Sequence, residues 1–163
     1  MNLPSRKAIR LQDYAYDSPG YYFITICTQD KRKLLCNIVV SDLIAGAETQ
    51  MLPYGLIAEE HLINMQQFYG DIYIDKFVIM PNHIHLLLCI PHEVIPGKHT
   101  IKKDKISRFI GTFKRFCRRD CGSNIWQYRS YDHVIRDEQD YRKIWNYIDR
   151  NPGKWTEDSL YVD

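Results

Sequence analysis

The sequence predicts an α+β domain with a ferredoxin-like or RRM-like fold, in which helices pack on a mainly antiparallel sheet. The length of 163 residues fits one domain better than two, so residues 1–163 are expected to fold as a single unit. A domain of this size can bury a core without disulfide or metal support, and its apolar share of 45% is an ordinary globular value. Segments with strand and helix patterns follow in the order β(β)αββαβα, with no internal repeat and no linker.

The first part of the chain predicts two strands and a helix. Residues 1–19 are polar and are expected to form an extended N-terminal arm. The β-branched and aromatic run at residues 21–28 predicts a strand, and residues 34–40 predict a second, shorter one. Residues 56–68 predict a helix that ends at Gly70. Its apolar face should hold the residues at helical spacing, which are Leu56, Leu62, Ile63 and Phe68.

A long apolar run in the middle of the chain is divided by Pro81-Asn82. Residues 72–80 and 83–90 are therefore predicted to be two separate strands. Because the link between them is so short, we expect them to pair antiparallel.

A basic segment follows these strands. Residues 98–119 carry nine Lys or Arg and one Asp, a local charge of +8, whereas the rest of the chain carries −6. Residues 106–117 predict an amphipathic helix ended by Gly122, with Ile106, Phe109, Ile110, Phe113, Phe116 and Cys117 on its apolar stripe. The charge pattern indicates a surface that binds polyanions, although a solvated helix face fits charge clustering equally well. The candidate phosphate-binding residues are Arg108, Lys114, Arg115, Arg118 and Arg119.

The last part of the chain predicts an aromatic strand or irregular segment at residues 126–135 and a helix at residues 138–150. Asp137 can cap the start of that helix, and Asn151-Pro152 should close it. Its core stripe should consist of Tyr141, Ile144, Trp145 and Ile148. Tyr147 falls to one side of this stripe, so periodicity alone favours a half-buried boundary residue.

The five cysteines are odd in number, and neither a signal peptide nor a membrane span is visible. We therefore expect a reduced protein of the bacterial cytoplasm with no membrane partner. Cys117 and Cys121 lie four residues apart without a second ligand pair at zinc spacing, which favours a packing role.

His83-Ile84-His85 stands out within the second strand of the apolar pair. Side chains of a strand alternate between its faces, so His83 and His85 should point the same way. Two such imidazoles suit adjacent coordination positions of one metal ion. The alternative is a pair of polar residues on a solvent-facing side of the strand, since a bare H-x-H motif is common.

With its flanks, this motif resembles the HUH signature of single-tyrosine transposases, in which a hydrophobic residue separates two metal-binding histidines. Further blocks resemble the REP-associated tyrosine transposase branch, in the family's order and over nearly the whole chain. The matching blocks are Phe77 to Leu87, Pro19 to Thr28, Trp126-Gln127, Tyr131 to Arg136, Asp140-Tyr141, Tyr147-Ile148 and Asn151-Pro152.

The resemblance implies a central strand for the HUH motif and roles for two further residues. Tyr147 matches the family's nucleophilic tyrosine, and Asn151, one helical turn later, matches its polar third metal ligand. Asn before Pro is also an ordinary helix-end signal. His83, His85 and Asn151 would together hold a divalent cation, Mg²⁺ or Mn²⁺.

The implied reaction cuts and rejoins single-stranded or hairpin DNA, such as REP-like palindromes, through a 5′-phosphotyrosine intermediate. Homodimers with exchanged tyrosine helices occur in the family's simplest enzymes but are not required in this branch, so the oligomeric state stays open. Tyr128 and Tyr131 could stack on bases, with packing the first interpretation. No role follows for His133.

Three alternatives remain at this stage. A non-catalytic nucleic-acid-binding module would explain the basic segment but not the order of His83, His85, Tyr147 and Asn151. A nickase of replication or conjugation would share the HUH chemistry. An unrelated metal hydrolase would use the histidines with water and form no covalent product with DNA.

Overall fold

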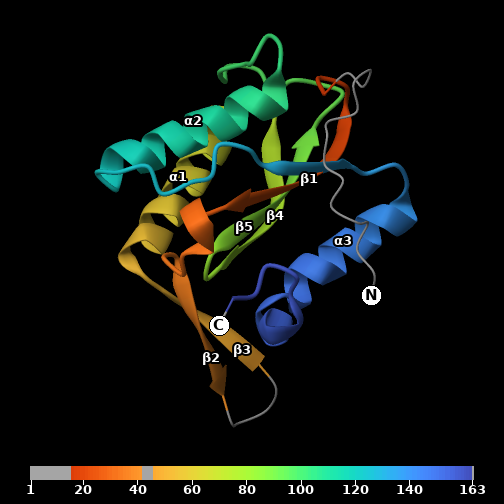
Figure 1. Ribbon diagram of the computed structural model, residues 1–163. Coiled ribbons are helices and arrows are strands. Elements are labelled where there is room, and N and C mark those ends of the chain that lie inside the picture. The colour runs from red at the N-terminus through yellow and green to blue at the C-terminus, as the bar shows by residue number, and fades with distance from the viewer. Residues whose placement is uncertain (1–15, 42–45, 163) are drawn as a thin grey trace.

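The computed structural model describes residues 16–41 and 46–162. A four-stranded antiparallel sheet with the strand order β4-β5-β1-β6 forms its centre (Figure 1). The strands are β1 (Gly20–Cys27), β4 (Tyr73–Met80), β5 (His83–Ile90) and β6 (Tyr131–Val134). The α+β prediction is thus confirmed, with the histidine motif on a central strand. Most of the predicted N-terminal arm, residues 1–15, lies outside the described residues, and a single domain over residues 1–163 stays a prediction.

Helices cover both faces of this sheet. α1 (Pro53–Phe68) and α2 (Lys105–Asp120) lie together on one face, and α3 (Glu138–Arg150) lies on the other (Figure 1). The predicted cap of α3 is confirmed, because the Asp137 carboxylate accepts a hydrogen bond of 2.8 Å from the backbone N–H of Asp140.

Alternation along the strands divides the core in two. Ile84, Leu86 and Leu88 of β5 pack in a large cluster with α1 and α2. Leu87 points the other way and packs with Ile144 and Ile148 of α3 in a smaller cluster. Both faces of β5 are buried, so the strand reads as a continuous apolar run interrupted only by its two histidines.

The buried face of α1 differs from the predicted one. Leu62 is buried as expected, but Leu56, Ile63 and Phe68 are 54%, 46% and 56% exposed. The helix instead brings Gly55 against the backbone of Leu35, since a Cβ on Gly55 would lie 2.0 Å from the Leu35 carbonyl oxygen. Because only glycine allows this close approach, Gly55 faces inward and sets which side of the helix is buried. The spacing of the apolar residues alone did not reveal this orientation.

The core stripe of α3 needs a similar correction. Ile144 and Ile148 are buried, whereas Trp145 is 38% exposed at the rim of the helix. Its ring lies 3.3 Å from the Nζ of Lys76, a cation–π contact that uses the ring without burying it in the core.

One strand and two 3-10 helices were not predicted. β2 (Cys36–Ser41), expected near residues 34–40, pairs antiparallel with β3 (Gly46–Met51), whose polar sequence gave no clear strand signal. After α3, the 3-10 helix η2 (Pro152–Glu157) turns the chain back against β2 and β3. A short 3-10 helix, η1 (Gln29–Lys31), follows β1.

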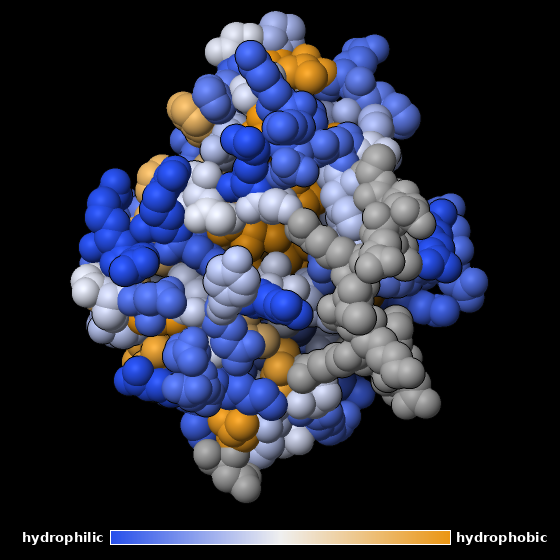
Figure 2. Space-filling view, turned by 45° about the horizontal axis from the view of Figure 1, so that its top comes forward, coloured by the Kyte–Doolittle hydropathy of each residue, from blue (hydrophilic) through white to orange (hydrophobic). Residues whose placement is uncertain are grey.

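Hydrophilic residues cover most of the molecular face in Figure 2, and hydrophobic ones show mainly near its centre and in small areas at the rim. Within residues 16–41 and 46–162, no helix has the length and hydropathy needed to cross a bilayer. All five cysteines are free thiols, and burial raises the pKa of both Cys36 and Cys117 to about 12.

Candidate active site

The candidate site lies between β5 and α3. His83 and His85 point to the α3 face of the sheet and are 0% and 2% exposed, so the solvent-facing alternative is excluded. Burial of two imidazoles among apolar residues requires polar partners.

Each histidine is oriented through its Nδ1 atom. The Asn82 side-chain nitrogen donates to the carbonyl oxygens of Leu160 (2.9 Å) and Lys31 (3.4 Å), so its oxygen faces the His83 Nδ1 at 2.8 Å. The Nδ1 of His83 therefore donates, and in the neutral ring Nε2 carries the lone pair. The Nδ1 of His85 lies 2.8 Å from the Thr25 hydroxyl.

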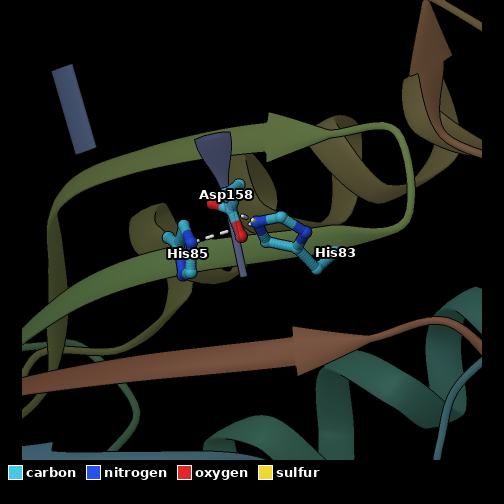
Figure 3. Close-up of side chains that lie close together, drawn as sticks. All are labelled: His83, His85 and Asp158. Carbon is cyan, nitrogen blue, oxygen red and sulfur yellow. Dashed lines mark hydrogen bonds and ion pairs between the residues drawn. The ribbon is translucent and has the colours of Figure 1, made fainter. Parts of the chain in front are cut away.

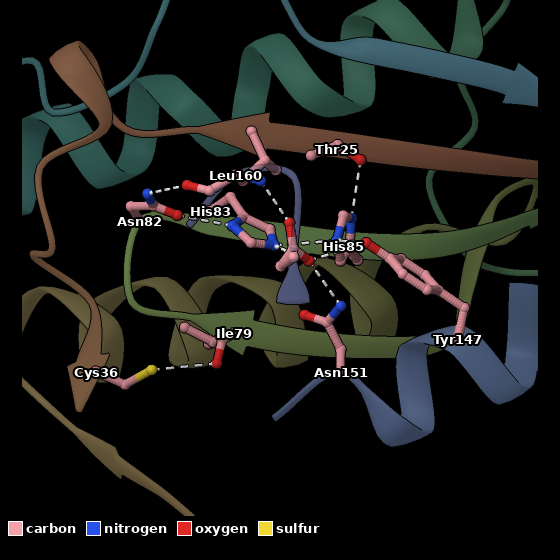
Figure 4. A network of polar contacts seen from close by, with 10 residues as sticks. Thr25, Cys36, Ile79, Asn82, His83, His85, Tyr147, Asn151 and Leu160 are labelled. Carbon is pink, nitrogen blue, oxygen red and sulfur yellow. Dashed lines mark hydrogen bonds and ion pairs between the residues drawn. The ribbon is translucent and has the colours of Figure 1, made fainter. Parts of the chain in front are cut away.

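These contacts turn the two Nε2 atoms toward each other. They lie 3.0 Å apart, and the rings meet edge to face at 4.4 Å (Figure 4). Histidines held at one nitrogen by a polar partner, with the other nitrogens converging, form the arrangement found in protein metal sites.

α3 brings Tyr147 and Asn151 to the histidines. The Tyr147 hydroxyl lies 3.3 Å from the His85 Nε2, and its ring packs edge-on against Phe23. Asn151, one turn later, is 2% exposed and points to the same place (Figure 4). The structure therefore assembles the four residues predicted for the metal and the nucleophile within one chain.

β4 holds α3 in position. The Tyr141 hydroxyl donates to Asp75 at 2.6 Å, and burial together with this contact raises the pKa of Tyr141. Lys76 donates to Asp149 at 2.8 Å while its ammonium lies over Trp145. The opposite edge of the helix is tied to β6, where the His133 Nε2 lies 2.8 Å from the Asp140 carboxylate. His133, for which the sequence suggested no role, thus fixes the first turn of α3.

Asp158 is a site residue that the sequence analysis missed. Its Oδ2 accepts hydrogen bonds from the Tyr147 hydroxyl (3.0 Å) and the Asn151 side-chain nitrogen (2.9 Å). The same oxygen lies 3.9 Å from the His83 Nε2, and the side chain is fully buried (Figure 3). Its Oδ1 accepts from the Leu160 N–H at 2.6 Å, which fixes the carboxylate.

The donor set fits a divalent cation. Ligand atoms of His83, His85 and Asp158 all lie within 4.8 Å of one another, and this is the one such group among the described residues. The side-chain oxygen of Asn151 is buried without a hydrogen-bond partner in the described part of the chain, which would cost free energy unless a cation used it. Imidazole nitrogens combined with carboxylate and amide oxygens suit Mn²⁺ and related ions.

The predicted phosphate-binding residues do not converge on this site. Arg108, Arg115, Arg118 and Arg119 are exposed on α2, which packs on the other face of the sheet. Arg119 is engaged by Asp120 at 2.6 Å. The Lys114 ammonium donates to the carbonyl oxygens of Gln127 (2.9 Å) and Tyr128 (3.2 Å), and burial lowers its pKa to about 8. Basic side chains and candidate active site thus lie on opposite sides of the sheet.

Comparison with known proteins gave several relatives, although no family model matches the chain. An uncharacterised protein of Haemophilus influenzae is 34% identical over 97% of this chain and 94% of its own length. A REP-associated tyrosine transposase of Escherichia coli K12 is 28% identical over 85% of this chain and 70% of its own. The solved structure of a REP-associated tyrosine transposase bound to a REP hairpin shares the fold, with a TM-score of 0.60 and 24% identity, covering 95% of this chain and 74% of that one.

Proposed function

This chain belongs to the family of REP-associated tyrosine transposases, and from that premise we propose that it cuts and rejoins single-stranded DNA with Tyr147 as the nucleophile. The observation that carries the proposal is the position of the Tyr147 hydroxyl, 3.3 Å from the His85 Nε2 and 3.0 Å from the Asp158 carboxylate. A boundary tyrosine that only filled space would not need a hydroxyl directed at a buried histidine pair.

In the proposed reaction, the Tyr147 oxygen attacks a backbone phosphorus in line with the leaving 3′ oxygen. A bond forms between the tyrosine oxygen and phosphorus, and the bond from phosphorus to the 3′ oxygen breaks. The products are a 5′-phosphotyrosine and a DNA end with a free 3′ hydroxyl, which can attack the phosphotyrosine and reverse the exchange. One phosphodiester replaces another, so the step needs no nucleotide cofactor.

Asp158 supports the activation of the nucleophile. A phenol has a pKa near ~10, so it must lose its proton to attack at neutral pH. The Asp158 Oδ2 accepts the Tyr147 hydrogen bond at 3.0 Å and is placed to take up that proton. The same carboxylate holds the Asn151 amide at 2.9 Å, so it also sets the position of a proposed ligand.

His83, His85 and Asn151 would hold the divalent cation, Mg²⁺ or Mn²⁺, with Asp158 beside them. When bound, the cation would polarise the scissile phosphate and offset the charge that grows on it during attack. Asn82 and Thr25 keep the two rings aligned through their Nδ1 atoms, which supports this assignment.

Hairpin DNA is the proposed substrate, because one relative of the same fold was solved bound to a REP hairpin. The exposed arginines of α2, Arg108, Arg115, Arg118 and Arg119, are proposed to contact phosphates of the duplex part, away from the reacting atoms. Because Tyr147 meets the histidines of its own chain, the proposed chemistry is complete in a monomer, and homodimer formation stays a prediction.

A covalent adduct tests the proposal. The protein is incubated with labelled hairpin DNA from palindromes that flank its gene, with Mn²⁺ or Mg²⁺, beside Tyr147→Phe and Tyr141→Phe. The proposal predicts a denaturation-resistant adduct that needs metal, disappears in Tyr147→Phe and persists in Tyr141→Phe, a matched change on the same helix. Binding without adduct would favour a non-catalytic binding module, and cleavage that survives Tyr147→Phe would favour water as the nucleophile.

A further inference from the structure

A three-residue bulge interrupts the pairing of β1 with the segment of residues 126–134, which ends in the edge strand β6. Tyr131 pairs with Thr25 inside the sheet, and Trp126 pairs with Thr28 in an isolated bridge. The Gln127 N–H donates to the Cys27 carbonyl at 2.9 Å, so pairing resumes on both sides of the interruption. Three residues, 128–130, therefore stand opposite the single residue 26 of β1. Bulges of this kind re-aim side chains and are frequent next to active sites.

The backbone of this bulge is anchored. The Lys114 ammonium of α2 donates to the carbonyl oxygens of both Gln127 and Tyr128, at 2.9 and 3.2 Å. Trp126, just before the bulge, is 1% exposed and packs against Phe113 with ring centroids 5.5 Å apart. Lys114 thus holds the backbone of the bulge in place through these two hydrogen bonds.

Tyr128 stands out from this anchored backbone. Its side chain is 96% exposed, the most exposed of the large hydrophobic side chains in the described part of the chain. Tyr131, the other aromatic residue considered for stacking, packs in the cluster beneath α3. The packing role considered from the sequence therefore applies to Tyr131 and not to Tyr128. Arg129, next in the chain, is also exposed.

The bulge lies beside the candidate active site. Thr25 and Cys27 of β1 stand opposite His85 and His83 of β5 and share their face of the sheet. The bulge occupies the next position outward, at the edge of the sheet beyond β1. Two strand spacings, about 10 Å, separate it from the histidines. DNA entering the site along this edge would reach the bulge within the first nucleotides from the scissile phosphate.

We propose that the Tyr128–Arg129 bulge binds the unpaired nucleotides next to the cleavage point, with Tyr128 stacking on a base and Arg129 contacting the backbone phosphate. This inference rests on the proposed function, since it takes the cleavage point from the Tyr147 site. An exposed aromatic ring and an exposed guanidinium on neighbouring residues suit a single strand, whose bases are free to stack. Base pairs inside a hairpin stem have both faces covered by their stacked neighbours and would offer the ring no face.

The test measures DNA binding in EDTA, so that it does not depend on catalysis. Wild type, Tyr128→Ala, Tyr128→Phe and Phe68→Ala are titrated with a hairpin that carries single-stranded flanks and with the same hairpin trimmed flush. Phe68→Ala removes another exposed aromatic side chain, 56% exposed on α1, and is the matched control. 2-Aminopurine at successive flank positions reports stacking.

The proposal predicts that Tyr128→Ala weakens binding of the flanked hairpin by about 5-fold or more. Binding of the flush hairpin should change less than about 2-fold, and 2-aminopurine fluorescence in the flank should rise because stacking is lost. Tyr128→Phe and Phe68→Ala should match wild type in both readouts. Equal weakening for both DNAs, or no effect on the flanked one, would overturn the inference.

The two proposals fail separately. If wild type forms the covalent adduct but Tyr128→Ala binds flanked DNA normally, the bulge assignment is wrong and the proposed reaction stands. If Tyr128→Ala shows the selective loss while no adduct forms, the single-strand contact stands and the proposed reaction fails.

Discussion

The Tyr147 hydroxyl donates a hydrogen bond of 3.0 Å to the Asp158 carboxylate, eleven residues later in the chain. η2 makes this contact possible by turning the chain back from the end of α3 toward the sheet. The same carboxylate oxygen receives the Asn151 amide and lies 3.9 Å from the His83 Nε2. One acidic side chain thus links the proposed nucleophile to the proposed metal ligands.

Asp158→Asn should lower the affinity for Mn²⁺ by about 10- to 100-fold, since it removes a buried negative charge beside the ligands while keeping the shape of the side chain. Isothermal titration calorimetry of the purified protein measures this change without DNA. Asp149→Asn is the matched control, because its carboxylate is half-exposed and pairs with Lys76 outside the site. Equal Mn²⁺ affinity in wild type and Asp158→Asn would remove Asp158 from the site.

Metal should stabilise the fold. At about 100 times its Kd, Mn²⁺ should add about 2.7 kcal/mol to the free energy of unfolding, a rise in Tm of about 5–10 °C for a chain of this size. Asn151→Ala should shrink this rise, since the buried oxygen that lacks a partner among the described residues would be gone. Thermal melts with Mn²⁺ and with EDTA check both points. An equal Tm of the wild-type protein in Mn²⁺ and in EDTA would contradict the metal assignment.

His133→Ala should destabilise the protein by about 0.5–1.5 kcal/mol, because it leaves the Asp140 carboxylate without its 2.8 Å contact to β6. Urea denaturation measures the loss. His92→Ala, a change in an exposed loop, should have no effect. An undiminished free energy of unfolding in His133→Ala would show that this contact does not hold α3 in place.

Lys114 should make stability depend on pH. Burial lowers its pKa in the folded chain from 10.5 to about 8, so between these values the unfolded state binds more protons than the folded state. Burial of the charged ammonium therefore lowers the free energy of unfolding below pH 8. This loss becomes smaller as the pH rises above 8 and the folded chain releases the proton. Relative to Lys114→Met, wild type should gain stability between pH 7.5 and 9.5 in chemical denaturation.

The matched control for this pH effect is Lys143→Met, which removes an exposed lysine of α3. The difference in stability between wild type and Lys143→Met should stay constant over the same pH range. A constant difference for Lys114→Met as well would mean that its ammonium is not buried in solution.

The shared face of the histidine pair could be predicted from the sequence because that relation is local, whereas Tyr147 and Asn151 were implied by the family resemblance, and periodicity alone favoured a half-buried boundary role for Tyr147. Period-two alternation places His83 and His85 on one face, and one helical turn aligns Tyr147 with Asn151. Asp158 could not be found in this way. Its position depends on the non-helical turn at Lys154 inside η2, where no periodicity relates it to Asn151.

The errors in the fold have the same origin. The buried face of α1 was predicted from the spacing of Leu56 and Ile63, which are exposed, because the close approach of Gly55 to Leu35 is a tertiary contact that spacing does not show. β3 is formed by the polar residues Gly46–Met51 and is specified by its pairing with β2 rather than by its own composition.

The measurement that most directly tests the central assignment is mass spectrometry of the trypsin-digested protein–DNA adduct. Trypsin separates the peptide of residues 144–150, whose single tyrosine is Tyr147, from residues 137–142, which contain Tyr141. The account predicts a nucleotide attached through its 5′ phosphate to the first of these peptides and to no other. A nucleotide on a different peptide, or cut DNA with no modified peptide, would contradict the assignment of Tyr147 as the nucleophile.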